Sequence, residues 1–204
     1  MSKKSTMNCV AKSISPCIET IKVVDGQVMH LVWHQMRFDK TRKELFNATS
    51  PLWLSSVLKP PTTGVYRIRI TYADTILNVE YLPYVMQDKK HFALIENTPE
   101  YNYKYANREA INRRIPSEVD DVIFVHEGLL MDTSIANIAL MIEHTWLTPK
   151  TPLLSGTTRA RLLASGFLKE AFLDVASLQS ASKFAIMNAL IGFKIIENQV
   201  IKGL

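Results

Sequence analysis

Hydrophobic and polar residues alternate along several short stretches of the first half of the chain, which predicts a sheet. Residues 65–72 alternate most clearly, with Tyr and Ile on one face and Arg and Thr on the other. Residues 18–24 and 27–32 flank Asp25-Gly26, a pair that accepts the positive φ of a tight turn, so a β-hairpin is expected. A partner strand is expected at 76–84 and a helix at 33–46. The first half is therefore predicted to be α+β with an antiparallel sheet.

The second half predicts more strands than helices. Asn97-Thr98-Pro99 indicates a linker over residues 88–99, which divides the chain into a small N-terminal α+β domain (1–90) and a C-terminal β-rich domain (91–204). Beyond the linker, a hairpin is expected at 122–125 and 129–131, further strands at 137–142, around 172, at 184–187 and at 194–196, and helices at 106–114 and 158–165.

The composition fits a globular protein in a reducing compartment. Of the 204 residues, 47% are hydrophobic and 21% charged, which excludes an intrinsically disordered chain. No apolar run approaches the roughly 18–20 residues that span a bilayer. The basic start, residues 1–6, is not followed by an apolar stretch, so no signal peptide is expected. Cys9 and Cys17 suit neither a disulfide framework nor a metal site, and a cytoplasmic location is expected.

The positive charge is confined to one half of the chain. Residues 1–90 hold 13 Lys and Arg against 7 Asp and Glu, whereas residues 91–204 hold 11 against 12. Such a surplus serves small anionic ligands as well as nucleic acid, and a solvated basic surface explains it equally well. His30 and His34 are four residues apart, but no third ligand accompanies them, so they are interpreted as structural and no metal is expected.

Four segments in order carry a resemblance to a known family: 19–22 with 25–26 and 34–37; 104–108; 128–137; and 148–149 with 154–159. Together they resemble the class IV (fold-type IV) pyridoxal-phosphate enzymes, which include branched-chain and D-amino-acid transaminases and aminodeoxychorismate lyase. The resemblance covers the chain from about residue 17 to its end. It implies an α+β fold like that of D-amino-acid aminotransferase, with an N-terminal α/β sandwich, a C-terminal β-rich pseudo-barrel and the cofactor in the cleft between them. It further implies a homodimer, a small anionic substrate, and neither nucleic acid nor membrane as a partner.

The resemblance also assigns the residues that bind pyridoxal 5'-phosphate. It places the Schiff-base lysine at Lys104, whose freed amine would shuttle the substrate proton. Asp132 falls where most relatives have Glu and would face the pyridine nitrogen. Arg37, Thr157 and Thr158 would bind the phosphate, the two threonines at a helix start where unpaired N–H groups attract anions. Without the family context, each of these residues also has an ordinary structural explanation, such as a helix cap or a surface charge.

Two further residues are candidates for substrate binding. Arg67 and Arg69 lie roughly 6–7 Å apart on one strand face, so their guanidinium groups need solvent or an anion between them. By analogy with the branched-chain enzymes, Arg69 is the candidate for a substrate carboxylate, and a solvated sheet face is the alternative. Asn188 belongs to a segment, residues 187–190, that looks more like aminodeoxychorismate lyase than like a transaminase.

The function expected from this resemblance is cleavage of 4-amino-4-deoxychorismate to 4-aminobenzoate and pyruvate, a step toward folate. The first alternative is a transaminase of branched-chain or D-amino acids, which would use the same cofactor residues. The second alternative is a cofactor-binding protein without turnover. It is motivated by Pro16-Cys17, which stand where relatives carry an N-terminal hairpin and a Gly-Asp-Gly-like segment.

Overall fold

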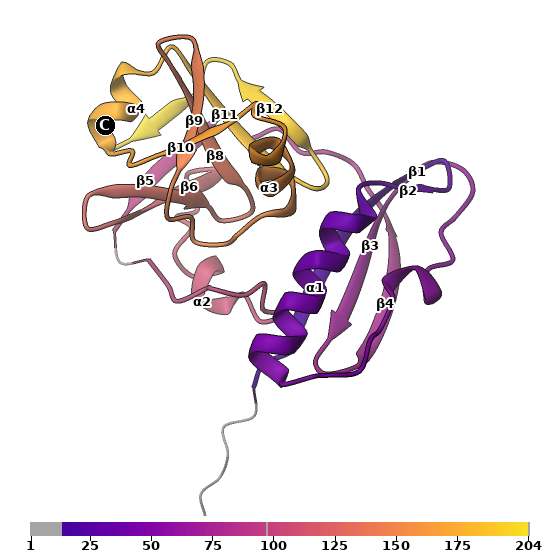
Figure 1. Cartoon of the computed structure of the whole chain (residues 1–204). Coiled ribbons are helices and arrows are strands. Elements are labelled where there is room, and N and C mark those ends of the chain that lie inside the picture. The colour runs from indigo at the N-terminus through magenta and orange to yellow at the C-terminus, as the bar shows by residue number, and fades with distance from the viewer. Residues whose placement is uncertain (1–13, 97, 204) are drawn as a thin grey trace, which may run out of the picture.

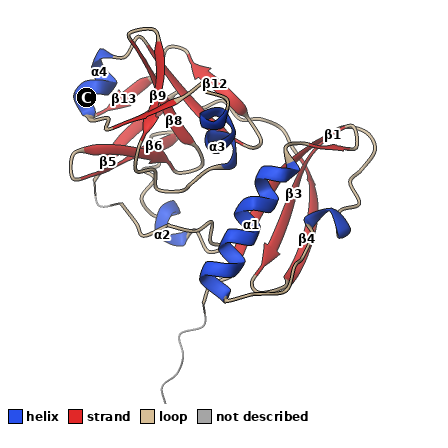
Figure 2. Ribbon diagram, viewed as in Figure 1, coloured by secondary structure: helices blue, strands red, loops and turns tan. Residues whose placement is uncertain are grey.

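The computed structural model describes residues 14–96 and 98–203, and in it the chain forms two β-sheets with helices packed against them (Figure 1, Figure 2). Cys9 and the basic start of the chain lie outside the described residues. The mixture of helices and strands confirms the predicted α+β class. In chain order the elements are β1 (Cys17–Val24), β2 (Gln27–Val28), α1 (Leu31–Phe46), the 3₁₀ turn η1 (Leu54–Ser56), β3 (Val65–Tyr72), β4 (Ile76–Pro83), β5 (His91–Ile95), α2 (Glu109–Asn112), β6 (Asp121–His126), β7 (Leu129–Thr133), β8 (Asn137–Ile142), β9 (Thr145–Pro149), α3 (Thr157–Ala164), β10 (Lys169–Ala171), α4 (Val175–Ser180), β11 (Lys183–Asn188), β12 (Gly192–Ile196) and β13 (Val200–Lys202).

The first sheet has the antiparallel order β2-β1-β3-β4, and α1 covers one of its faces. Alternate residues of β1 and β3, such as Ile21 and Ile68, are fully buried with Phe38 of α1. Burial of each such side chain stabilises the fold by about 1.5–3 kcal/mol. The intervening residues, which include Thr20, Arg67 and Arg69, therefore project from the opposite face of the sheet.

The second sheet has nine strands within the described residues, in the order β10-β9-β8-β7-β6-β5-β13, with β11 paired to β8 and β12. Its strand β5 corrects the predicted linker over 88–99, because residues 91–95 are paired in parallel with both β6 and β13. Phe92 is fully buried there. The run is short and apolar without alternation, so no periodic pattern distinguished it from a connection.

Other elements also differ from their predicted bounds. The strand expected at 27–32 ends at Val28, because the chain turns there and α1 begins at Leu31. Helix α2 spans four residues instead of 106–114, because Ala106 N donates a hydrogen bond to Pro16 O (2.8 Å) and so joins the edge of β1. The strand expected around Phe172 lies earlier, at β10, and leaves Phe172 exposed. Helix α1 begins two residues before the predicted start, directly after His30 in a left-handed conformation (φ 53°).

The proposed boundary at residue 90 falls between β4 of the first sheet and β5 of the second, and the division of the chain into domains 1–90 and 91–204 stays a prediction. Among residues 14–96 and 98–203, no helix has both the length and the apolar character needed to cross a membrane.

Candidate active site

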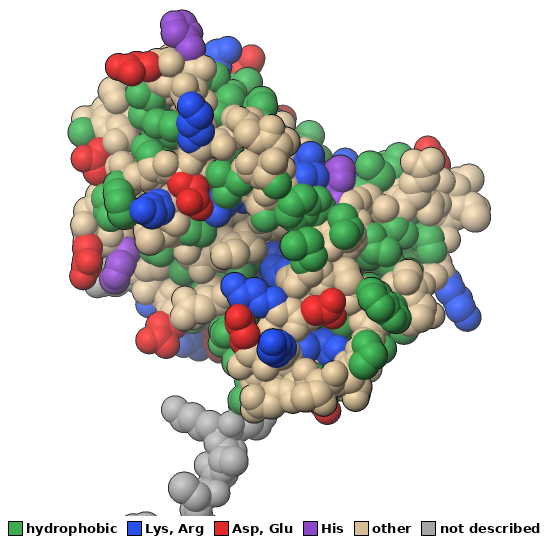
Figure 3. Space-filling model, in the orientation of Figure 1, with side chains coloured by type: hydrophobic (Ala, Val, Ile, Leu, Met, Phe, Trp, Pro, Cys, Tyr) green, Lys and Arg blue, Asp and Glu red, His purple; other side chains and the backbone are tan. Residues whose placement is uncertain are grey.

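A cavity of about 950 Å³ lies where the two sheets meet, a size typical of small-molecule sites. On the face drawn in Figure 3, Lys and Arg side chains gather between the two parts of the molecule. Thr158 is buried but is not part of the cavity wall. The other site residues predicted from the sequence all line the cavity: Arg37, Arg69, Lys104, Asp132, Thr157 and Asn188.

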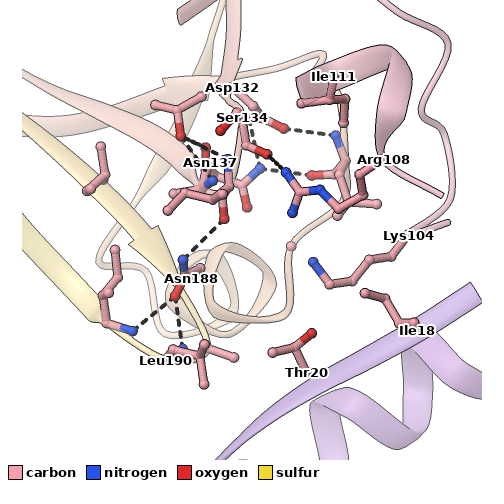
Figure 4. Close-up of a pocket in the computed structure, with 18 of the residues that line it drawn as sticks. Ile18, Thr20, Lys104, Arg108, Ile111, Asp132, Ser134, Asn137, Asn188 and Leu190 are labelled. Carbon is pink, nitrogen blue, oxygen red and sulfur yellow. Dashed lines mark hydrogen bonds between the residues drawn. The ribbon is translucent and has the colours of Figure 1, made fainter. Parts of the chain in front are cut away.

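Lys104 is held at the cavity by backbone contacts with β1. Ile18 N donates a hydrogen bond to Lys104 O (2.8 Å), and the neighbouring Tyr103 and Tyr105 pack against the core of the first sheet. Figure 4 shows the Lys104 side chain extending into the cavity, with Ile18 and Thr20 on one side and Arg108 on the other. Burial lowers the pKa of the Lys104 amine to about 7, and the nearby Arg37 and Arg108 contribute to this shift. The amine can therefore both accept and donate a proton near neutral pH.

Arg37 lies on α1 and lines the cavity wall, where it forms a buried ion pair with Glu19. The sequence did not predict this pair. Arg37 Nε donates to Glu19 Oε1 (2.8 Å) and its Nη2 to Glu19 Oε2 (2.6 Å). His34 Nδ1 lies 2.6 Å from the same Oε2. Burial alone would raise the pKa of Glu19, but Arg37 and His34 outweigh it and lower this pKa to about 2. A charged residue at a core position of an alternating strand is the pattern that indicates such a buried pair.

Asp132 is a buried carboxyl on β7 that has hydrogen bonds but no ion pair among the described residues. Its Oδ1 accepts a hydrogen bond from Asn137 Nδ2 (2.8 Å), and its Oδ2 accepts one from Leu154 N (2.8 Å). Burial raises the pKa of Asp132 to about 7, although these hydrogen bonds oppose the shift. A cation placed beside this carboxyl would favour its ionised form.

Asn137 connects Asp132 to the loop that precedes α3. Besides Asp132, Asn137 Nδ2 reaches Leu154 O (2.8 Å). A Cβ atom at Gly156 would lie 1.9 Å from Asn137 Oδ1, so only glycine fits at this position. Gly156 is also the residue before α3 and provides no side-chain cap, which leaves the first N–H groups of the helix, beside Thr157, without a capping side chain. These N–H groups can bind an anion at the cavity wall.

Replacement of Gly156 by alanine is expected to destabilise the protein by about 1–3 kcal/mol, because the new methyl group would overlap Asn137 Oδ1. The backbone of Gly156 (φ −73°, ψ 144°) suits alanine, so the cost is steric. Chemical denaturation of Gly156→Ala measures this loss. In an Asn137→Ala background, which removes Oδ1, Gly156→Ala should cost far less. An equal cost in both backgrounds would show that the contact with Asn137 does not determine the need for glycine.

The two predicted substrate-binding residues occupy different walls of the cavity. Arg69 projects from β3, and its Nε lies 3.9 Å from Glu80 on the neighbouring strand. Asn188, at the end of β11, holds the backbone of the following turn. Its Oδ1 accepts hydrogen bonds from Leu190 N (2.9 Å) and Ile191 N (3.0 Å), and its Nδ2 donates to Ile135 O (3.1 Å). The side-chain oxygen and nitrogen of Asn188 are therefore already hydrogen-bonded to the backbone, and Asn188 orders this part of the cavity wall.

The comparisons with known proteins agree on one family. The model of the family described as "Amino-transferase class IV" matches residues 73–198. An uncharacterized protein of Haemophilus influenzae is 28% identical over 185 residues, which are 87% of this chain and 98% of that protein. A Schizosaccharomyces pombe protein named "Putative aminodeoxychorismate lyase" is 31% identical over 167 residues, 72% of each chain.

A solved structure supports the same fold. The crystal structure of "a putative 4-amino-4-deoxychorismate lyase" from Haemophilus somnus 129pt superposes with a TM-score of 0.79 at 25% identity. The match covers 87% of this chain and 97% of that one. A solved protein therefore has the same two-sheet architecture over nearly its whole length.

Proposed function

The chain belongs to the amino-transferase class IV family, and from this premise we propose that it is a pyridoxal-phosphate-dependent 4-amino-4-deoxychorismate lyase that releases 4-aminobenzoate and pyruvate. The observation that carries the proposal is the joint position of Lys104 and Asp132 on one cavity, in a chain whose relatives include proteins named as such lyases.

The residues around the cavity fit this cofactor. Pyridoxal phosphate needs an amine for its aldehyde, an acid for its ring nitrogen and a cradle for its phosphate. Among the described residues, the Lys104 amine has no hydrogen bond or ion pair, and Asp132 is a buried carboxyl without an ion pair. The uncapped start of α3 and the guanidinium of Arg37 supply donors for an anion. We therefore propose that Lys104, Asp132, Arg37 and Thr157 hold the cofactor, and that Thr158, which is buried outside the cavity wall, contributes only its backbone N–H at the start of α3.

Each of these residues would have a defined part in the reaction. When bound, the cofactor supplies an electron sink for the carbanion that forms when the substrate loses a proton. Lys104 would accept that proton, since burial keeps its pKa near neutrality. Asp132 would remain ionised and hold a proton on the ring nitrogen. Glu19 would fix the guanidinium plane of Arg37 through its two hydrogen bonds, so that the remaining N–H groups of Arg37 stay on the cavity side.

A transaminase of branched-chain or D-amino acids is the second candidate, because the same residues would hold the cofactor. The lyase is favoured by the relatives and by residues 104–108 and 187–190, which resemble the lyase segments. Purified protein loaded with pyridoxal phosphate should form 4-aminobenzoate from 4-amino-4-deoxychorismate. It should form no keto acid from amino acids with 2-oxoglutarate. The opposite pattern would assign the transaminase, and no product in either assay, with cofactor bound, would favour a protein without turnover.

We further propose that the protein is a cytoplasmic homodimer of two-domain subunits. Leu77 near the start of β4, and Val85 and Met86 beyond its end, are exposed large hydrophobic side chains, which a subunit interface would cover. Light scattering during size-exclusion chromatography would measure the mass of the assembly.

A further inference from the structure

The cavity wall is strongly basic, and most of its cations have an acidic partner. Its acids are Glu109 and Asp132. Its Lys and Arg residues are Arg37, Arg67, Arg69, Lys89, Lys104, Arg108, Arg113 and Lys194. The ion pairs that engage them are Arg37 with Glu19, Arg69 with Glu80, Lys89 with Asp121, Arg113 with Glu109, and Lys194 with Asp88. Within the part of the chain that the structure describes, Arg67, Lys104 and Arg108 have no ion pair.

Arg67 is the cation whose position the proposed reaction does not explain. It lies in the middle of β3 on the face away from α1, half-buried at the cavity wall. The residue opposite it on β1 is Lys22 and the one opposite it on β4 is Leu82. Its Nε atom is buried without a hydrogen-bond partner. Like charges opposite each other on adjacent strands are destabilising, and a buried donor without an acceptor is costly. Both costs disappear if an anion lies against Arg67.

Two more hydrogen-bond donors line the same cavity. Tyr84 follows β4, and its backbone N donates to Val65 O (3.0 Å), two residues from Arg67. Lys194 comes from the second sheet, on β12 opposite Ile186. Leu82 is opposite Arg67 and Tyr84 follows it by two residues, so the side chains of Arg67 and Tyr84 lie on the same face of the sheet. Burial raises the pKa of the Tyr84 phenol, and the charges of Arg67 and Lys194 oppose this rise. All three side chains line the cavity.

We propose that Arg67, Tyr84 and Lys194 form a second anion-binding site of the cavity, which binds a carboxylate of the substrate remote from the amine that reacts at Lys104. The site is built from both sheets, so it is complete only where they meet. It differs from the position assigned to Arg69, which lies beside Glu80 on β4. Lys194 also contacts Asp88, but an ammonium group has three N–H donors, so further donors remain for an anion. The inference rests on the proposed function in one respect, that this cavity is where the substrate reacts. The second anion-binding site would make the protein selective for dicarboxylates over amino acids with a single carboxylate.

Binding of small aromatic acids to the cofactor-loaded protein tests this proposal without turnover. Benzene-1,3-dicarboxylate should bind at least tenfold more tightly than benzoate, because one of its carboxylates can contact Arg69 while the other contacts the second anion-binding site. In Arg67→Gln this ratio should fall close to one while benzoate binding stays the same, since a hydrogen-bonded charge pair contributes about tenfold to a hundredfold in affinity. Isothermal titration calorimetry measures both ligands. A ratio unchanged in Arg67→Gln would overturn the proposal.

Lys22→Gln is the matched control, because Lys22 lies opposite Arg67 on the same sheet but outside the cavity wall. It removes the same charge and should leave the ratio as in the wild type; a fall as large as in Arg67→Gln would mean that net charge alone explains the preference, and would reject the site. If Arg67→Gln does not fold, Tyr84→Phe and Lys194→Gln decide, and each should lower the ratio.

The two proposals fail separately. Without 4-aminobenzoate formation, a ratio that falls in Arg67→Gln still supports the second anion site and rejects the lyase. With 4-aminobenzoate formation, an unchanged ratio and an unchanged kcat/KM in Arg67→Gln reject the anion site and keep the lyase.

Discussion

Replacement of Lys104 by alanine is expected to lower turnover by more than about 10³-fold and to remove the covalent attachment of the cofactor. Both losses have one cause, since the same amine would bind the cofactor aldehyde and carry the proton. The environment of Lys104 suits both tasks, because burial and the charges of Arg37 and Arg108 keep its pKa near 7. Borohydride reduction followed by peptide mapping should find the adduct on Lys104 in the wild type and no adduct in Lys104→Ala.

Lys104→Arg should fail as well, because a guanidinium remains charged and cannot form an imine with an aldehyde. Both variants should still bind the cofactor without a covalent bond, through Arg37, Thr157 and the start of α3. Lys22→Ala serves as the control, since it removes a lysine from the same sheet outside the cavity wall and should leave activity intact. An adduct on a lysine other than Lys104 would show that the motif assignment, and the proposed function with it, is wrong.

The fold could be predicted best where the pattern is local and periodic. β3 has the predicted bounds, and β1 with β2 forms the hairpin around Asp25-Gly26. Elements without a periodic pattern were missed. The turn before β9 contains Glu143 and His144, both with positive φ, whereas Asn-Gly and Asp-Gly are the pairs that signal such a turn in a sequence. Helix α4 has only six residues and depends on a capping box in which Asp174 and Ser177 exchange hydrogen bonds.

The site could be predicted only in part for a related reason. Lys104, Asp132 and Arg37 belong to ordered motifs, so a resemblance marked them as candidates, and all three line the cavity. Glu19 has no local pattern that reveals its partner, since Arg37 is 18 residues away and meets it only when α1 packs on β1. Arg67, Tyr84 and Lys194 line one cavity only through the pairing of β3 with β4 and the contact of the two sheets. Contacts of this kind depend on register and packing, which a single sequence does not fix.

Asp132→Asn is expected to change the pH dependence of stability in the cofactor-free protein. The pKa of Asp132 is about 7 in the folded state and near its ordinary value of 3.8 in the unfolded state. Between these values the folded protein keeps a proton that the unfolded chain has lost, so stability falls as pH rises through this window. The slope is on the order of 1 kcal/mol per pH unit. Asp132→Asn removes this fall, which thermal unfolding between pH 4 and pH 8 would measure.

Asp132→Asn leaves the contribution of Lys104 to the pH dependence of stability in place. The lowered pKa of Lys104 makes stability rise with pH, and only above about pH 7, so the two contributions can be told apart. A wild type and an Asp132→Asn variant with equal slopes between pH 4 and pH 7 would mean that Asp132 is ionised throughout this range without the cofactor. Asn137→Ala is a useful comparison, because it removes one hydrogen bond that favours the ionised form. The pKa of Asp132 in the folded state should then rise further, and the fall in stability should continue to higher pH.

In the cofactor-loaded protein, Asp132→Asn should lower turnover by about 10²-fold or more. The buried carboxyl is costly to ionise in the empty cavity and becomes favourable only opposite a cation, which is what a protonated ring nitrogen provides. An amide in its place cannot stabilise that cation, so the carbanion would lose its electron sink while the phosphate contacts stay. Cofactor affinity should therefore change far less than kcat. Near-normal turnover in Asp132→Asn would reject the assignment of Asp132 to the ring nitrogen, and a loss confined to cofactor affinity would give Asp132 a binding role only.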